Sequence, residues 1–221
     1  IPTDRIAVVQ GDSDRIARGG GTGGSRSVTV QTNVTLTAVA EIVEKFSAFV
    51  AEEAGVAASA VSFDDERFRA EGTNLTPTML EVAEMARAKG RDDLLVLEAT
   101  AQLPARSFPN GAHVAEVEID PETGVVRVDR YTVVDDFGNL INPMLAEGQV
   151  HGGVVQGIGQ ALTERVVYDE EGQLLSASFM DYAMPRATDV PMIGFDTEPV
   201  PSTANPMGMK GCGEAGTVGA L

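Results

Sequence analysis

Apolar residues at spacings of three and four predict a long amphipathic helix in the first quarter of the chain. Between positions 28 and 54 they are Val39, Ile42, Val43, Phe46, Phe49 and Val50, which lie on one face of an α-helix. Ser25 or Ser27 is a suitable N-cap for this helix. A second helix is expected from about Pro77 to Lys89, with proline in its first turn and Gly90 as its stop.

Short β-branched or alternating runs predict the strands. They fall at residues 5–10, 60–63, 67–70, 94–102, 113–120, 125–134, 166–169 and 176–181, with the turn sequence DPETG at 120–124 joining two of them as a hairpin. The proline-containing stretch that follows, as far as Val200, predicts a loop. Together these elements predict an α+β fold with mixed sheets over residues 1–221, with two subdomains at about 1–100 and 101–221 as an option.

Residues 142–164 have a helical pattern that is interrupted by glycines at positions 148, 152, 153, 157 and 159. Each glycine costs a helix about 1 kcal/mol relative to alanine. We therefore expect these glycines to permit a close approach of the helix to a neighbouring element or to a ligand.

Composition excludes several classes of protein. The 221 residues include 33 acidic and 16 basic side chains, which give a net charge of −17, so nucleic acid and anionic membranes are poor partners. Apolar runs are far shorter than the roughly 20 residues that span a bilayer, and the chain is predicted to be soluble and cytoplasmic. The single Cys212 excludes an internal disulfide, and one cysteine cannot hold an iron–sulfur cluster or a zinc ion. Nor do His113 and His151 indicate a metal site.

A glycine-rich loop at residues 19–27 is the first segment that could carry chemistry. It contains G-x-G-x-x-G, but it does not fit a dinucleotide-binding turn. The turn is too long, and the next expected strand begins about 40 residues later rather than supplying an acidic residue about 20 residues on. What the residues support is an anion-binding loop with hydroxyl donors at Thr22, Ser25 and Ser27 and a positive charge at Arg26. The alternative is a flexible loop without a ligand.

The glycine-rich helix is the second such segment. Gln149, Gln156 and Gln160 place amide groups next to bare backbone, which suits a polar heterocycle or a phosphate. The alternative is a helix that packs closely on its neighbour and leaves its glutamines in solvent.

The third segment is KGCGEAGT at residues 210–217. If this glycine-rich backbone packs into a cleft, Glu214 is desolvated and becomes a competent general base near neutral pH. Lys210 would then moderate that effect or hold an anionic ligand. The alternative is an exposed acid in a loop.

Three motifs in this order resemble the molybdenum hydroxylase family, which includes xanthine dehydrogenases, aldehyde oxidases and the large subunits of aerobic-type carbon monoxide dehydrogenases. They are GDSDRIARGGGTGGSRS at 11–27, GQVHGGVVQGIGQALTE at 148–164 and NPMGMKGCGEAGTVGA at 205–220. The likeness covers essentially the whole chain. It implies the C-terminal, second molybdenum-cofactor-binding portion of a large subunit.

The resemblance also implies roles for particular residues. In the family, the glutamate equivalent to Glu214 is the base that deprotonates an oxygen ligand of molybdenum. The family's loop equivalent to Thr22, Gly23, Gly24, Ser25, Arg26 and Ser27 approaches the metal and the pterin phosphate or dinucleotide. Gln149 matches a glutamine that hydrogen-bonds near the molybdenum ligands, whereas Lys210, Gly213 and Gln156 are weaker matches. None of these side chains is expected to ligate the metal.

The family's large subunit is much longer than this chain, which implies a piece of a longer polypeptide. Its expected partners are the missing N-terminal half, iron–sulfur and FAD subunits or domains, a small-molecule substrate (an aldehyde, an N-heterocycle or carbon monoxide) and, through exposed apolar surface, a second copy. The isolated chain is expected to be inactive and to hold no molybdenum cofactor, and the cytosine dinucleotide form of the pterin is left open. A non-catalytic assembly module and an anion-binding or nucleotide-binding domain are the alternative functions.

Overall fold

The computed structural model describes residues 1–16 and 18–221. The chain divides into two compact units. Unit 1 comprises Ile1–Gly21 and Gln31–Gln102, and unit 2 comprises Thr22–Val30 and Leu103–Leu221.

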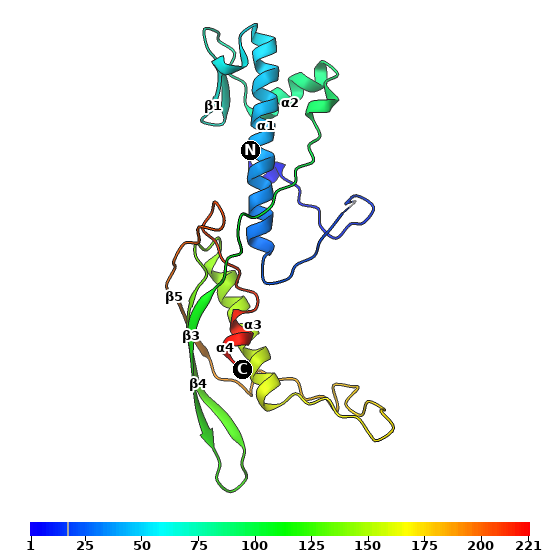
Figure 1. The fold of residues 1–221 in the computed structure, drawn as a ribbon, viewed down its shortest axis with the longest axis vertical. Coiled ribbons are helices and arrows are strands. Elements are labelled where there is room, and N and C mark those ends of the chain that lie inside the picture. Colours follow the sequence, from blue (N-terminus) through cyan, green and yellow to red (C-terminus); the bar gives the residue numbers. More distant parts are fainter. Residues whose placement is uncertain (17) are drawn as a thin grey trace. The chain divides into compact units, whose positions relative to one another are not determined.

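Unit 1 is built on a long helix, a short hairpin and a second helix (Figure 1). These elements are α1 (Ser27–Ala54), β1 (Val61–Asp64), β2 (Arg67–Ala70) and α2 (Met79–Ala88), with 3₁₀ turns at Thr3–Arg5, Ala58–Ala60 and Asp92–Leu94. The core consists of Phe46, Phe49, Val50, Phe68, Ala70, Val82 and Ala86. Both predicted helices and the strands predicted at 60–63 and 67–70 are therefore confirmed. Phe46, Phe49 and Val50 of α1 enter the core as their spacing predicted, whereas Val39 is 47% exposed.

The hairpin and the start of α2 follow from local chemistry. The turn between β1 and β2 places Asp65 and Glu66 at positive φ, as the tight turns that suit twisted strands require. Thr78 caps α2: its hydroxyl accepts the Glu81 amide proton at 3.3 Å, and the Glu81 carboxylate accepts the Thr78 amide proton at 2.7 Å. This reciprocal capping box begins the helix one residue after its cap, so Pro77 lies outside the first turn, where the sequence placed it.

The predicted N-cap of α1 is wrong. The first helical residue is Ser27, and the Arg26 carbonyl accepts the Val30 amide proton at 3.0 Å, so Arg26 occupies the N-cap position. Ser25 has φ of 53°, a left-handed conformation rather than the extended one of a cap residue.

Two predicted strands of unit 1 are not formed. Residues 6–10 and 96–102 have no ladder partner within the described chain, and Val8 and Val96 are 78% and 72% exposed. A β-branched run is stable as a strand only when a neighbouring strand takes its backbone hydrogen bonds, and the sequence pattern does not reveal whether one is present.

Unit 2 contains a three-stranded sheet in the order β3–β4–β5. Strands β3 (Asn110–Ile119) and β4 (Val126–Asp136) form the predicted antiparallel hairpin, with a register shift between Glu116 and Val117. Strand β5 (Ile193–Thr197) pairs in parallel with β4, within the stretch that the sequence predicted as a loop. Of the strand predicted at 166–169, one isolated bridge between Tyr168 and Leu174 is formed, and residues 176–181 form no strand.

Helix α3 (Pro143–Leu162) packs on this sheet, and the short helix α4 (Ala215–Gly219) lies beside α3 (Figure 1). The Asn142 side chain caps α3 by accepting the Leu145 amide proton at 3.2 Å. The core between helix and sheet consists of Val128, Tyr131, Val133, Phe137, Ala146, Val150, Val154 and Ile158. The α+β class predicted from the sequence is confirmed.

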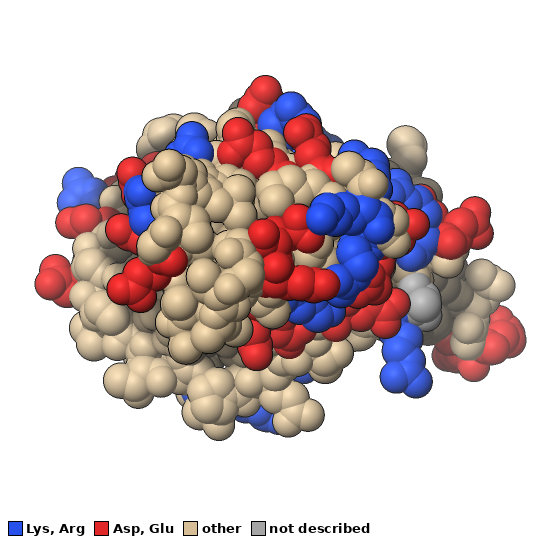
Figure 2. Space-filling view, turned by 90° about the horizontal axis from the view of Figure 1, so that it is seen from above, with Lys and Arg blue, Asp and Glu red and all other residues tan. Residues whose placement is uncertain are grey.

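Charged side chains of both signs are interspersed on the surface. On the face drawn in Figure 2, lysine and arginine side chains lie among aspartate and glutamate side chains, as in the Arg130–Glu116 pair across β3 and β4 at 3.3 Å. Within residues 1–16 and 18–221, no helix is both long enough and apolar enough to cross a membrane.

Candidate functional site

The three glycine-bearing segments of the sequence meet within unit 2. A Cβ atom placed on Gly213 would lie 3.3 Å from Ser25 Oγ and 3.7 Å from Gln149 Nε2, and a Cβ on Gly211 would overlap the Ser25 carbonyl group. The loop before α1, the exposed side of α3 and the segment before α4 therefore converge. The glycines at 211 and 213 are what allow this approach.

Ser25 is the central residue of this convergence. It is held at positive φ, which is uncommon for a residue with a side chain, and its hydroxyl is buried with no hydrogen-bond partner within the described chain. A buried hydroxyl without a partner costs free energy. Such an orphaned donor next to Gln149 and Gly213 is typical of a binding site described without its ligand.

The rest of the loop offers open backbone. A Cβ placed on Gly23 or on Gly24 would meet no atom within 4 Å, and Arg26 is exposed. The hydroxyls of Thr22 and Ser27 form a short hydrogen bond across the loop, which closes it next to the first turn of α1. Backbone amides at a helix N-terminus bind anions, and this loop leaves them accessible.

Glu214 lies directly after the convergence. Gly211 is buried against Ser25, yet the Glu214 side chain is exposed. The sequence predicted that packing of this loop would desolvate the carboxylate, and that part of the prediction is wrong for the chain by itself. Glu214 is instead the N-cap residue of α4, so its backbone is part of that helix end.

Lys210 is occupied by an ion pair. Its ammonium group hydrogen-bonds to Asp136, and the two side chains are 9% and 13% exposed. Burial raises the pKa of Asp136, but the hydrogen bonds from Lys210 and from the Val200 and Gly138 amides outweigh it, so that this pKa lies below its ordinary value. In this chain Lys210 therefore anchors its segment to the end of β4.

Four of the five glycines of α3 divide into two groups, and the fifth, Gly159, faces Glu164 and Pro185. A Cβ on Gly153 would lie 2.9 Å from the Thr217 amide nitrogen, and one on Gly157 would lie 2.7 Å from the Ala220 Cβ. These two glycines permit the close approach to a neighbour that the sequence indicated, and that neighbour is α4. Gly148 and Gly152 meet nothing within 4 Å and leave part of the helix open.

The glutamines of α3 also differ from one another. The Gln149 side chain is exposed beside Gly213. Gln156 accepts a hydrogen bond from the Thr217 hydroxyl at 3.2 Å and so joins α3 to α4.

A buried polar cluster next to α4 was missed from the sequence. His113 Nε2 lies 3.3 Å from Asp135 Oδ1, and His113 Nδ1 lies 3.0 Å from the Tyr131 hydroxyl. Burial raises the pKa of Asp135, and nearby His113 only partly reverses this. Burial, with a contribution from Asp135, also raises the pKa of Tyr131. The signal in the sequence was an acid and a histidine at positions of β3 and β4 that face the core.

Metal ligands are not grouped in this chain. Within the described residues, no three histidine, cysteine or acidic side chains lie close enough to hold a metal ion. Cys212 is half-buried, and desolvation raises the pKa of its thiol, so it is held as a neutral thiol rather than as a thiolate ligand.

Comparison with known proteins gives a consistent result. A family model described as a molybdopterin cofactor-binding domain matches residues 1–191. The carbon monoxide dehydrogenase large chain of Afipia carboxidovorans is 35% identical over 227 residues, covering 100% of this chain and 28% of that relative. Subunit gamma of the 6-hydroxypseudooxynicotine dehydrogenase complex of Paenarthrobacter nicotinovorans is 33% identical over 226 residues, with the same coverage.

A solved structure agrees with these relatives. The crystal structure of Cu,Mo-CO dehydrogenase in its carbon monoxide-reduced state matches with a TM-score of 0.80 and 35% identity, over 100% of this chain and 28% of that chain. The chain thus spans little more than a quarter of the length of the relatives that it matches.

Proposed function

We propose that this chain, which belongs to the family of molybdopterin cofactor-binding domains in molybdenum hydroxylase large subunits, forms one side of a molybdenum–pyranopterin site with Glu214 as its general base. The observation that supports this most directly is the meeting of three segments at Gly213, where a Cβ atom would lie within 4 Å of both Ser25 Oγ and Gln149 Nε2. Segments that are more than sixty residues apart in the sequence converge there, immediately before Glu214.

The residues present fit such a cofactor. The orphaned Ser25 hydroxyl and the open backbone at Gly23 and Gly24 offer neutral donors, and exposed Arg26 offers a positive charge. Donors of these kinds suit the phosphate of a pyranopterin or of its cytosine dinucleotide form. Gln149 adds an amide group beside Gly213, which can hydrogen-bond to the cofactor.

When bound, the cofactor supplies a redox centre at which a substrate carbon is hydroxylated with oxygen from water. Glu214 accepts, at a carboxylate oxygen, the proton that the water-derived nucleophile loses. Gln149 orients the groups beside it, and the glycine at 213 leaves space that a side chain would fill. The exposed Glu214 of this chain becomes desolvated when the rest of the large subunit covers it, which makes the carboxylate a stronger base.

The whole enzyme extends beyond this chain. We assign it to the molybdenum-dependent oxidoreductases of the xanthine dehydrogenase and aldehyde oxidase type, acting on an aldehyde, an N-heterocycle or carbon monoxide. Its partners are the remainder of the large subunit and iron–sulfur and FAD subunits. Support comes from the names of the relatives, which are a large chain and a subunit of a dehydrogenase complex.

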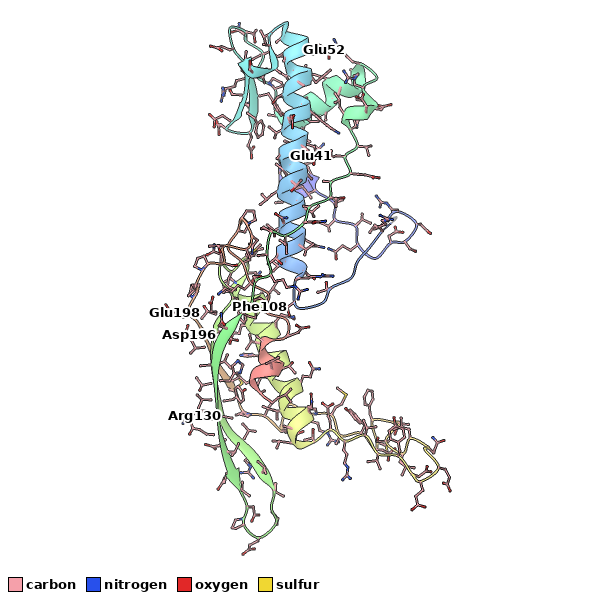
Figure 3. The ribbon with its side chains drawn as sticks, in the orientation of Figure 1. Glu41, Glu52, Phe108, Arg130, Asp196 and Glu198 are labelled. Atoms are coloured by element: carbon pink, nitrogen blue, oxygen red, sulfur yellow. The ribbon has the colours of Figure 1, made fainter. Side chains whose placement is uncertain are left out.

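The test is Glu214→Gln in the assembled enzyme. Removing a positioned general base lowers the rate of the chemical step by about 10²–10⁴-fold, whereas molybdenum content, measured by mass spectrometry of the metal, stays near that of the wild type. The matched control is Glu198→Gln, an exposed glutamate that Figure 3 shows beyond the end of β5, with turnover unchanged. Wild-type turnover in the Glu214 variant would contradict the assignment of the base.

The chain by itself is expected to bind no stoichiometric molybdenum and to have no hydroxylase activity, since it carries one side of the site. Metal analysis of the purified 221-residue chain measures this directly. Molybdenum at one equivalent per chain would show that these residues hold the cofactor alone.

A further inference from the structure

Helix α4 connects Glu214 to the buried polar cluster of unit 2. The Glu214 carbonyl accepts the Val218 amide proton at 3.1 Å, so Glu214 belongs to the first turn of a helix that ends five residues later at Gly219. A helix this short has little stability of its own. Its position, and with it the position of Glu214, depends on what holds its far end and its sides.

Two side chains of the sheet hold that far end. The Tyr131 hydroxyl donates to the Gly219 carbonyl at 3.2 Å, and a Cβ placed on Gly219 would overlap the His113 ring. Tyr131 is 2% exposed and the His113 side chain is 8% exposed. The end of α4 is thus fastened by a buried hydroxyl and packed on a buried imidazole.

The hydrogen bonds from Gly219 to Asp135 require protons at particular atoms. A carbonyl cannot donate, so the single hydroxyl proton of Tyr131 goes to Gly219. The Tyr131 oxygen must then accept from His113 Nδ1, which fixes a proton on that nitrogen. The remaining contact, between His113 Nε2 and Asp135 Oδ1, is a hydrogen bond only if one of those two atoms also carries a proton.

The surroundings favour retention of that proton. The Asp135 side chain is 1% exposed, and its second carboxylate oxygen, Oδ2, is buried with no partner in the described chain. A buried and half-satisfied carboxylate resists ionisation without a positive neighbour. The titratable groups that face the pair are Tyr131 on β4 and Cys212 in the segment before α4, and neither supplies a positive charge.

We propose that Tyr131 and His113 are positioning residues for Glu214, which hold α4 through a hydrogen-bond chain that is complete only when the His113–Asp135 pair carries one added proton. The importance of this positioning for turnover rests on the proposed function, in which Glu214 is the base. The fastening of α4 does not, and it is measured separately.

The first experiment measures hydrogen exchange in the assembled enzyme, on peptides that cover residues 214–221. Tyr131→Phe keeps the ring and removes the hydroxyl, and it is expected to speed amide exchange in α4 about fivefold to tenfold, as the loss of one hydrogen bond would, with exchange in α3 unchanged. Tyr168→Phe, at a tyrosine that is 60% exposed, is the matched control and changes neither. Wild-type exchange of α4 in Tyr131→Phe would overturn the proposal.

The second experiment tests whether the hydrogen bonds that hold α4 require the added proton on the His113–Asp135 pair. In the wild type, protection of α4, corrected for intrinsic exchange rates, should fall as pH rises and the pair loses its proton. Asp135→Asn places an amide donor opposite His113 Nε2, which completes the chain with a neutral imidazole, so its protection should be retained without dependence on pH. Protection that is independent of pH in the wild type, or an equal pH dependence in Asp135→Asn, would overturn the proton requirement.

Turnover separates this inference from the proposed function. If both hold, Tyr131→Phe lowers kcat about fivefold to tenfold with little change in KM, whereas Asp135→Asn retains the kcat of the wild type and flattens its pH profile. If Glu214→Gln leaves turnover unchanged, the base assignment fails while the exchange results still decide how α4 is held.

Discussion

In unit 1 the interior is filled by large apolar side chains, and in unit 2 the part of the interior next to Glu214 is closed by glycine backbone and buried polar groups. Phe68 packs 6.1 Å from Phe46 and 4.6 Å from Phe63, measured between ring centroids. By contrast, α3 and α4 touch where Gly153 faces the backbone of Gly216. The difference indicates that the candidate site is placed by backbone contact, which leaves amides and short polar groups near it, rather than by side-chain bulk.

The largest expected effect is on stability, and it tests whether the apolar core of unit 1 unfolds independently of the core of unit 2. Phe68→Ala removes a fully buried ring and should lower the free energy of unfolding by about 3–5 kcal/mol, measured by urea denaturation. Hydrogen exchange should lose protection in α2 and β2 but not in α3.

Phe108→Ala is the matched control, since this phenylalanine of unit 2 is 66% exposed and is labelled in Figure 3. Its effect should stay within about 0.5 kcal/mol. Equal loss of protection in α3 in the Phe68 variant would mean that the two cores unfold together, and the comparison would fail.

The next prediction concerns the glycines of α3, two neighbours on one helix. The Cβ atom that Gly152→Ala adds would meet no atom within 4 Å. This substitution should therefore stabilise the chain by about 1 kcal/mol through helix propensity. Gly153→Ala gains the same propensity, but its Cβ would lie 2.9 Å from the Thr217 amide nitrogen, and overpacking of this kind costs about 1–3 kcal/mol.

The difference between these two variants isolates the contact between α3 and α4. It is measured as the difference in urea unfolding midpoints at equal slope. If Gly153→Ala were as stable as Gly152→Ala, backbone contact would not be what places α4.

The sequence could predict those elements that depend on local patterns, and it missed those that depend on distant partners. The helices and the β1–β2 and β3–β4 hairpins were predictable because apolar spacing and turn residues are local. The cost of glycine in α3 was visible too, and it led correctly to a close neighbour. Strand β5 was missed because its partner β4 lies about sixty residues earlier, and residues 5–10 were overpredicted because a β-branched run does not reveal whether a partner strand exists.

The candidate site shows the same division between features that local sequence reveals and features that depend on distant contacts. Ser25, Gln149 and Gly213 could be selected as candidates from their glycine-rich surroundings and from the family resemblance. Burial could not be predicted: Glu214 is exposed in this chain, and Lys210 is paired with Asp136. The contact of His113 with Asp135 joins residues 22 positions apart across two strands. Alternation places each residue on the core side of its strand, but no local pattern indicates that the two side chains meet.

The smallest expected effect compares one carboxylate from each unit. Asp136 in unit 2 is mostly buried and paired with Lys210, whereas Glu81 in unit 1 is exposed and accepts hydrogen bonds from the Thr78 amide and hydroxyl. The pKa of each lies below its ordinary value. For Asp136, the opposing effect of burial is outweighed by its hydrogen-bond donors, and for Glu81 the backbone hydrogen bond from Thr78 is the main cause.

A carboxylate with a lowered folded-state pKa stabilises the fold above its unfolded pKa, and this stabilisation is lost as pH falls through the folded pKa. Both Asp136→Asn and Glu81→Gln should therefore flatten the fall in unfolding free energy below about pH 4, measured by urea titration at several pH values. Salt distinguishes the two, because 1 M NaCl screens the field around an exposed group far more than a buried ion pair. The contribution of Glu81 should shrink in salt while that of Asp136 persists. Equal salt sensitivity would mean that the ion pair at the end of β4 is as open to solvent as a surface cap, so that the segment leading to Glu214 would have no buried anchor at Lys210.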